Sequence, residues 1–365
     1  MSQLDNELHS TTFVLGAGFS KDAGLPVSSD LYKKILSNEF DSKIEEAITQ
    51  AISDFLFTVF GWQGQINDDL PSLEDIFTCI DLSESTGHNL GYHYKPNHLR
   101  ALRRLLIHRI FSILDRRYEE SPEISKLLRN FCIDNNSEIK CNFIVLNWDI
   151  VLENHLRALN QRVNYCIPCY DWYDPRMPLS LEGFSICKMH GSSNWVYCDN
   201  CKSLFYSFDE KLALHLDAGL NYADFKSLNL EIDPEDFNSR FRSEETLCKL
   251  CKNKVSTHIA TFSYRKSFRT AAYSSIWYQA EKLLADSDHW IFIGYSLPDA
   301  DYEFKHLLKS AQIRNSQFNI GEGKKIDVVT NDRNIGEKYK LFFGHKSINN
   351  FHCNGLKDYV SELNR

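Results

Sequence analysis

The sequence predicts an α/β fold, a Rossmann-like doubly wound parallel sheet that carries a helical insertion and a small zinc-ribbon module. Two observations lead to this prediction: short apolar runs alternate with helical stretches, and two C-x-x-C pairs lie in the second half of the chain. Of the 365 residues, 43% are apolar and 25% are charged, so the chain can bury a sizeable core. We expect one main domain over residues 1–365.

Four short apolar runs are typical of strands that are buried on both faces of a parallel sheet. In such a sheet, ligands bind beyond the carboxyl ends of the strands. Every polar motif discussed below directly follows one of these runs or lies between two of them. A stretch from about residue 21 to residue 40 has helical character and is expected to follow the first strand. The four runs are residues 11–15, 141–146, 290–294 and 326–330.

Residues 41–130 carry apolar side chains at helical spacing, as at Leu99, Leu102 and Leu106, and predict a helical insertion. Arginines are interleaved with these apolar positions. They could form a basic face for a partner, although a plain solvated helix face is the commoner arrangement. The arginines are Arg100, Arg103, Arg104, Arg109, Arg116 and Arg117.

The charge balance disfavours direct binding to nucleic acid or to an anionic membrane. With 41 Lys and Arg against 49 Asp and Glu, the net charge is −8. No apolar stretch approaches the roughly 18 residues that a membrane span needs, and the first ten residues are polar. The 11 cysteines cluster in C-x-x-C pairs, which favours metal ligands in a reducing compartment over disulfides. These observations together predict a cytoplasmic protein.

A glycine-rich turn follows the first strand. Its glycines permit a tight turn and a close approach of the backbone to a pyrophosphate at a helix N-terminus. Alone, the motif fits a structural strand-to-helix turn equally well. Followed by Gly24-Leu25-Pro26, however, it resembles the opening signature of the sirtuin family. The residues of the turn are Gly16, Ala17, Gly18, Phe19 and Ser20.

Two further motifs extend the resemblance to sirtuins. Asn147-Trp148-Asp149 follows the second strand, and His190-Gly191 follows later in the chain. In isolation, the first could be a helix N-cap and the second a satisfied core histidine. Sirtuins carry an Asn-x-Asp and a His-Gly in the same order.

Two cysteine pairs have the spacing of a structural zinc site, because four thiolates can close a tetrahedral site. The first pair begins eight residues after His190, as in sirtuins, whereas the segment between the pairs, residues 202–247, is longer than usual there. We therefore expect a zinc-ribbon module with an insertion over residues 187–256. The ligands are Cys198, Cys201, Cys248 and Cys251.

Other potential metal ligands fit a second site poorly. Cys166 and Cys169 could compete, but Pro168 and the surrounding aromatic residues indicate a buried loop. The histidines at positions 88, 93 and 98 lie five residues apart, so they do not share one helix face.

The last two motifs follow the third and fourth strands. Gly294 and Ser296 belong to G-Y-S-L-P-x-x-D, which ends at Asp301 and stands where sirtuins carry the Gly-Thr-Ser turn under the adenosine half of NAD. This form is similar to that of the divergent sirtuin-like branch. Asn331 stands where sirtuins place an Asn near the adenine ribose.

Departures from the protein deacylases indicate which kind of sirtuin-like protein this chain resembles. Deacylases continue the G-[IL]-P motif with Asp-Phe-Arg, whereas this chain has Val27-Ser28-Ser29. It also lacks their Phe-Gly-Glu segment after the second cysteine pair and reads THIATFSY at residues 257–264. The whole chain looks most like the sirtuin-like NAD hydrolases of prokaryotic antiphage defence.

That resemblance implies an NAD+ glycohydrolase that cleaves NAD to nicotinamide and ADP-ribose as an abortive-infection effector. Asn147 would orient the nicotinamide ribose and the attacking water, Asp149 would fix the carboxamide, and His190 would act as general base. Residues 16–20 would hold the pyrophosphate. The adenosine side would contact Gly294, Ser296 and Asn331.

The resemblance also implies partners. These are NAD, further copies of the chain in a homo-oligomer, and an activating protein such as a HerA-type ATPase or an Argonaute, with residues 41–130 as the assembly surface. Neither a membrane nor direct nucleic-acid binding is expected. Two alternatives stay open: an NAD-dependent protein-lysine deacylase, and a non-catalytic subunit that binds NAD or ADP-ribose.

Overall fold

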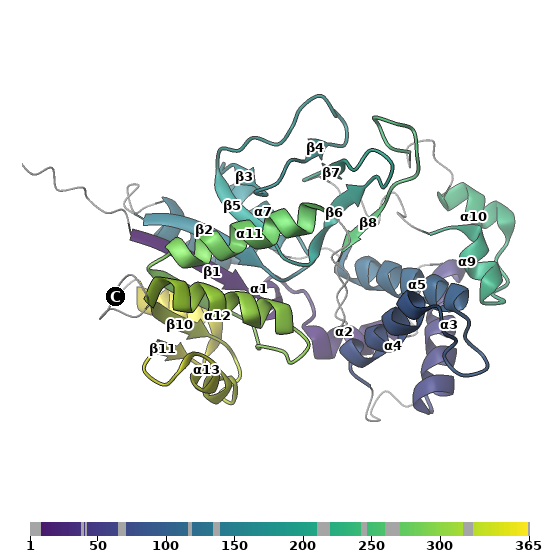
Figure 1. Cartoon of the computed structure of the whole chain (residues 1–365), viewed down its shortest axis with the longest axis horizontal. Coiled ribbons are helices and arrows are strands. Elements are labelled where there is room, and N and C mark those ends of the chain that lie inside the picture. Colours follow the sequence, from purple (N-terminus) through teal and green to yellow (C-terminus); the bar gives the residue numbers. More distant parts are fainter. Residues whose placement is uncertain are drawn as a thin grey trace, which may run out of the picture.

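The chain folds into a sheet-based body with a separate helical unit at one end of its long axis (Figure 1). No helix among the described residues combines the length and the apolarity needed to cross a bilayer. The computed structural model describes residues 9–37, 40, 42–64, 71–115, 119–133, 139–209, 220–241, 247–259, 271–316 and 324–363.

The body is built on a seven-stranded sheet in the order β11-β10-β9-β1-β2-β5-β3, and every neighbouring pair is parallel. The predicted α/β fold with a parallel sheet is therefore confirmed. All four strands expected from the sequence are present. They are β1 (His9–Leu15), β2 (Ile139–Val145), β9 (His289–Ile293) and β10 (Lys325–Val329). The remaining strands are β3 (Val163–Asn164), β5 (Phe184–Lys188) and β11 (Ile348–His352).

The centre of the sheet is a topological switch point. From β1 the chain continues to β2 on one side of it, and it returns later to β9 on the other side. Leu15 is in register with both Val145 and Ile293, so the carboxyl ends of the three strands meet at one edge. Ligands of doubly wound sheets bind at this kind of position.

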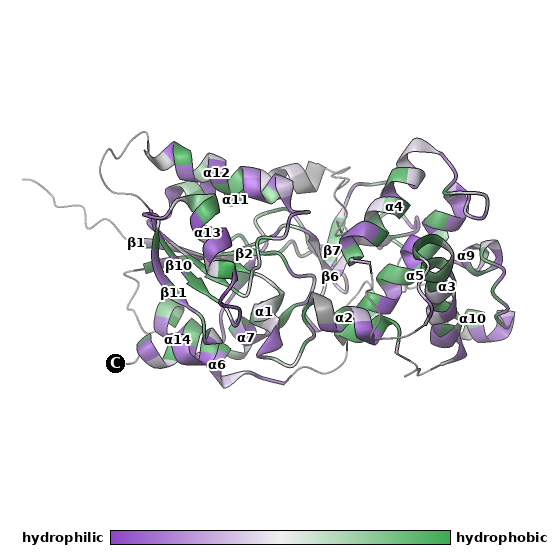
Figure 2. Cartoon of the chain, turned by 90° about the horizontal axis from the view of Figure 1, so that it is seen from below, coloured by the Kyte–Doolittle hydropathy of each residue, from purple (hydrophilic) through white to green (hydrophobic). Residues whose placement is uncertain are grey.

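Helices cover both faces of the sheet. In Figure 2, α11 (Ala271–Asp286) and α12 (Tyr302–Ser316) lie on one side of it, and α6, α7 and α14 lie on the other. The bounds of these last three are Pro122–Leu128, Val151–Ala158 and Gly355–Leu363, and the short π-helix η1 (Arg129–Ile133) and α13 (Ile335–Phe343) complete the body.

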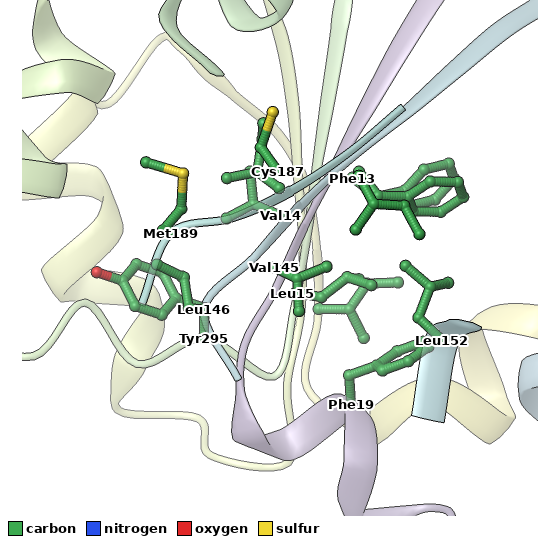
Figure 3. Packing of buried hydrophobic residues seen from close by; sticks show 14 of the residues in the cluster. Phe13, Val14, Leu15, Phe19, Val145, Leu146, Leu152, Cys187, Met189 and Tyr295 are labelled. Atoms are coloured by element: carbon green, nitrogen blue, oxygen red, sulfur yellow. The ribbon is translucent and has the colours of Figure 1, made fainter. Parts of the chain in front are cut away.

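Burial on both faces explains the apolar runs with which the inner strands end. Phe13, Val14 and Leu15 of β1 are fully buried. Figure 3 shows these side chains packed among residues of neighbouring elements, including Val145 and Leu152.

The helix expected from about residue 21 to residue 40 is wrong in its bounds. Helix α1 (Ala17–Lys21) begins directly after Gly16, and a second helix, α2, covers Ser28–Ile35. Between them Gly24 has a φ of +82°, a left-handed conformation that ends the first helix, and Pro26 follows.

The helical unit has its own apolar core, formed by α2, α3 (Lys43–Phe60), α4 (Leu73–Thr86) and α5 (Pro96–Asp115). Its core includes the residues whose spacing predicted helix, Leu99, Leu102 and Leu106, all buried on α5. The boundaries 41–130 for an insertion stay a prediction.

Three of the six arginines of this unit are paired with carboxylates. Arg109 is 1% exposed and contacts Glu45 at 3.4 Å, so the interpretation as a solvated face is wrong for it. Arg103 pairs with Asp81, and Arg104 pairs with Asp224. Arg116 and Arg117 lie outside the described residues, and Arg100 is exposed.

A second sheet of four strands lies beside the body in the order β4-β7-β6-β8. Its longest strand, β6 (Gly191–Tyr197), pairs antiparallel with β7 (Leu204–Tyr206) and β8 (Ser256–Ile259), while β4 (Tyr170–Asp171) pairs with β7. Two helices follow β7 in the chain, α9 (Tyr222–Ser227) and α10 (Pro234–Phe241).

These two helices pack onto the helical unit instead of the second sheet. Phe225 and Phe237 belong to the core of the helical unit. Asp224 accepts a hydrogen bond from Arg104 Nε at 2.9 Å. The segment between the cysteine pairs therefore joins two parts of the molecule.

A buried ion pair connects β5 to α7. Lys188 Nζ lies 3.2 Å from Glu153 Oε1, and both side chains are 0% exposed. Lys188 Nζ also donates to the main-chain oxygen of Asp149. The Tyr165 hydroxyl donates to Glu153 at 3.3 Å and accepts from Asn194 at 3.0 Å. Burial raises the pKa of Glu153, and the Lys188 charge opposes that shift.

We expect Lys188→Met and Glu153→Leu each to lower the free energy of unfolding by about 3–5 kcal/mol, because each leaves an uncompensated polar group in the interior. The double variant Lys188→Met/Glu153→Leu should lose less than the sum of the single losses. Urea denaturation measures these values. Arg162→Ala, which breaks an exposed pair with Glu182, is the control and should cost at most about 1 kcal/mol. Additive losses would show that the two buried groups are not coupled.

Candidate functional site

A cavity of about 400 Å³ lies at the switch point, beyond the carboxyl ends of β1, β9 and β10. Five of the predicted binding residues line it: Ala17, Gly18, Gly294, Ser296 and Asn331. The other lining residues are Lys21, Asp22, Val27, Ile293, Val329, Thr330, Asp332, Ile335, Gly355 and Leu356.

The glycine turn after β1 packs directly against the turn after β9. A Cβ atom on Gly18 would lie 2.6 Å from the Gly294 Cα, and Gly294 itself has a φ of +63°. The amides of Gly16 and Gly18 donate to the carbonyls of Ile293 and Gly294, each at 3.0 Å. The glycines are thus required for contact between two loops of the site.

Not all of the turn faces the cavity. Gly16, Phe19 and Ser20 do not line it, and the Phe19 side chain points into the core beside Leu152 (Figure 3). The amides of Gly16 and Gly18 already donate to carbonyls of the protein. On this side, the surface of the cavity is formed by Ala17 and Gly18.

Asn147 ties the end of β2 to the glycine turn. Its side-chain amide donates to the Gly16 carbonyl at 2.9 Å and to the Ser20 hydroxyl at 3.0 Å. The sequence placed Asn147 and the turn in one site, and the structure brings them into direct contact.

Asp149 lies at the start of α7. Its Oδ1 accepts the Val151 amide at 3.1 Å, and its main-chain oxygen accepts from Lys188. The side chain therefore closes a short turn before α7. It is not the N-cap, which is Ile150 and makes no side-chain cap hydrogen bond.

His190 lies in the turn between β5 and β6 and is buried. Its Nδ1 is 3.1 Å from the Leu146 carbonyl oxygen, and its Nε2 is 3.5 Å from Asp301 Oδ1. Asp301 was noted in the sequence only as the end of a motif. Nothing in the sequence indicated that it faces His190, because the two residues follow different strands.

Neither Asn147 nor His190 lines the cavity itself, but each contacts a segment that does. Asn147 bonds to the turn that carries Ala17, and His190 faces Asp301 in the loop that carries Ser296. The two residues predicted to be catalytic thus lie at the same edge of the sheet as the cavity.

The four cysteines of the predicted zinc module come together. Their Sγ atoms all lie within 4.8 Å of one another, with Cys198 to Cys251 at 3.4 Å and Cys201 to Cys248 at 3.6 Å. A tetrahedral site with Zn–S bonds of about 2.3 Å requires sulfur separations of about 3.8 Å. The arrangement fits a zinc ion held by four thiolates.

The two pairs are presented by turns with the same backbone. The main-chain amide of Lys202 donates to the Cys198 carbonyl at 2.8 Å, and that of Lys252 donates to the Cys248 carbonyl at 2.9 Å. The φ angles of the two lysines are +61° and +62°. The Cys198 and Cys248 amides also donate to carbonyls five residues later. Two equivalent turns face each other across the sulfur cluster, as expected for metal ligands from two halves of one module.

The thiols differ in acidity. Hydrogen bonds from Asn253 lower the pKa of Cys251 to about 5, which favours the thiolate that binds metal. Burial raises the pKa of Cys248 to about 12, so zinc would have to displace its proton on binding.

The cysteine cluster is the only group of potential metal ligands found among the described residues. Cys169 is buried and Cys166 is half-buried, and neither joins that group. His88, His93 and His98 do not form a ligand group either.

Comparisons with known proteins give limited similarity. No family model matches the chain, and no curated protein matches its sequence. Among solved structures, it is similar to one described as showing the mechanism and regulation of Sir2 enzymes, at 11% identity over 98% of this chain and 91% of that chain, with a TM-score of 0.45. It is also similar to a Sir2–p53 peptide–NAD+ complex, at 13% identity over 98% and 93%, with a TM-score of 0.42. Since both TM-scores lie below 0.5, we draw no conclusion about function from this similarity.

Cys248→Ser should lower the melting temperature strongly, because a structural zinc contributes folding free energy directly. We expect about one zinc per chain in the purified protein by elemental analysis and a lower melting temperature after chelation. Cys353→Ser, outside the cluster, is the matched control and should melt as the wild type does. A protein without zinc, or a Cys248→Ser variant with unaltered melting, would contradict the metal site.

Proposed function

We propose that the protein is an NAD+ glycohydrolase that cleaves NAD to nicotinamide and ADP-ribose. The observation that supports this most is the switch-point cavity, with its glycine turn, beside Asn147 and His190. Together with the sirtuin-like motifs, this arrangement suits a dinucleotide whose reactive ribose lies near those two residues.

The NAD-binding side of the proposal assigns roles along the cavity. Ala17 and Gly18 would lie against the pyrophosphate, where the absence of a Gly18 side chain permits close approach. Gly294, Ser296 and Asn331 would contact the adenosine half. In this assignment, the side of the turn that faces away from the cavity is formed by Gly16, Phe19 and Ser20.

The chemistry requires positioning more than acid catalysis. Nicotinamide leaves as a neutral molecule from a cationic pyridinium, so the leaving group needs no proton. The transition state resembles an oxocarbenium ion, and fixed dipoles and orientation lower its energy. Asn147 would orient the ribose and the attacking water, Asp149 the carboxamide, and His190 would accept a proton. NAD+ and water then give nicotinamide, ADP-ribose and one proton.

Water is the proposed acceptor because the acyl-peptide features of deacylases are missing. Val27 lines the cavity where those enzymes carry the Asp of Asp-Phe-Arg. The segment that replaces their Phe-Gly-Glu extends beyond residue 259 and lies largely outside the described residues.

We further propose that this activity is gated, since constitutive NAD hydrolysis would poison the host cell. In this proposal the chain is a cytoplasmic abortive-infection effector of antiphage defence that forms a homo-oligomer and is activated by a partner such as a HerA-type ATPase or an Argonaute. The helical unit supports an assembly role, because it stands at one end of the molecule and exposes Phe57 and Tyr92 (Figure 1).

Asn147→Ala and His190→Ala should each lower NAD cleavage by at least ~10²-fold, the usual scale for losing a positioned catalytic group. Nicotinamide release from purified protein, alone and with candidate partners, measures this. His345→Ala, at an exposed position after α13 and away from both the cavity and the helical unit, is the control. Wild-type rates in both site variants would place the reaction elsewhere.

Expression with its activator should deplete cellular NAD and arrest growth, and the His190→Ala protein should be harmless. Acetyl-lysine peptides should not accelerate nicotinamide release, because water is the acceptor. NAD levels, growth curves and product analysis test these outcomes. A strict requirement for acylated peptide would establish a deacylase instead, and a constitutively active monomer would remove the gating. Binding of NAD without cleavage under any condition would identify a non-catalytic subunit.

A further inference from the structure

The ring of His190 lies between two oxygen atoms that belong to different parts of the sheet. Its Nδ1 is 3.1 Å from the Leu146 carbonyl oxygen, and its Nε2 is 3.5 Å from Asp301 Oδ1. A carbonyl oxygen can only accept a hydrogen bond, so the proton of the neutral ring lies on Nδ1. Nε2 is then the nitrogen that can accept a proton, and it faces a carboxylate.

Asp301 is held in place by its own contacts. The residue is 6% exposed, and its second oxygen, Oδ2, accepts a hydrogen bond from the Tyr295 hydroxyl at 3.1 Å. Burial, followed by the Asp301 charge, raises the pKa of Tyr295, so this hydroxyl keeps its proton and donates it. The Tyr339 hydroxyl donates in turn to the Tyr295 carbonyl at 2.9 Å.

The contact between His190 and Asp301 spans the switch point. His190 follows β5, and Asp301 precedes α12 in the segment that follows β9. In the sheet, β9 and β5 are separated by β1 and β2. The pair therefore connects the half of the sheet that carries the adenosine side of the cavity to the half that carries the proposed catalytic histidine.

We propose that Asp301 is a positioning residue for His190: its carboxylate lies beside Nε2 and stabilises the charged ring that forms when Nε2 accepts a proton during the reaction. This inference rests on the proposed function. In the step concerned, an O–H bond of the attacking water breaks and an N–H bond forms at Nε2. The water oxygen bonds to the anomeric carbon of the ribose, and the bond from that carbon to nicotinamide breaks, its electron pair leaving with nicotinamide. The resulting imidazolium lies 3.5 Å from the Asp301 carboxylate, whose negative charge stabilises it.

Asp301→Asn tests this proposal because it removes the charge and keeps the shape. Under whichever condition the wild type cleaves NAD, we expect kcat to fall by about 10- to 100-fold, the scale of one charge-assisted interaction, with KM changed by less than about threefold. Asp299→Asn is the matched control. Asp299 lies in the same loop, but it is exposed and pairs with Lys305 and Lys338.

A second measurement does not depend on activity. In long-range 1H–15N correlation spectra, the ring signals of His190 are assigned by their loss in the His190→Ala protein. The Nε2 signal should shift in Asp301→Asn. The signal of Nδ1, which bonds to the Leu146 carbonyl, should shift less. Asp299→Asn should leave both signals in place. Thermal melting shows whether the variants are folded.

The outcomes separate the two proposals. An unchanged Nε2 signal, or an Asp301→Asn variant with wild-type kcat, overturns the role of Asp301. A wild-type protein that releases no nicotinamide under any condition overturns the proposed function instead, and the Nε2 signal then decides alone whether Asp301 positions His190. If Asp301→Asn lowers the melting temperature but leaves kcat and the Nε2 signal unchanged, the contact between Asp301 and His190 is purely structural.

Discussion

The geometry of the site depends on one buried ion pair, between Lys188 and Glu153. Lys188 ends β5, two residues before His190, and Glu153 lies on α7, which follows the turn that carries Asn147 and Asp149. Because Lys188 also bonds to the Asp149 carbonyl, a single ammonium group fixes the histidine turn relative to the Asn-x-Asp turn. Two charges in a dry interior are costly to separate, so neither turn can shift without breaking this contact.

The inner strands could be predicted from the sequence, and the outer ones could not. β1, β2, β9 and β10 each end in an apolar run that is buried on both faces of the sheet, as at residues 13–15, 143–145, 290–293 and 328–329. The two edge strands carry polar residues that solvent permits, such as Asn164 in β3 and Asn350 in β11, and β5, which is five residues long, lies next to an edge as β10 does. Their apolar runs are too short to stand out from loops.

The components of the site were visible in the sequence, but their contacts were not. The cysteine spacing predicted four ligands, and they meet because two local turns repeat one geometry. By contrast, the contacts of His190 with Asp301 and of Arg109 with Glu45 join residues far apart in the chain. Such pairs arise from the packing of whole elements, and no local pattern encodes them.

The segment between the cysteine pairs links the cysteine cluster to the helical unit. Its helices α9 and α10 are anchored in the helical unit, while its two ends return to the same sulfur cluster. Strand β6 begins at Gly191, directly after His190. It ends at Tyr197, directly before Cys198 of the cluster. The strand therefore connects the cysteine cluster directly to the turn that holds the histidine.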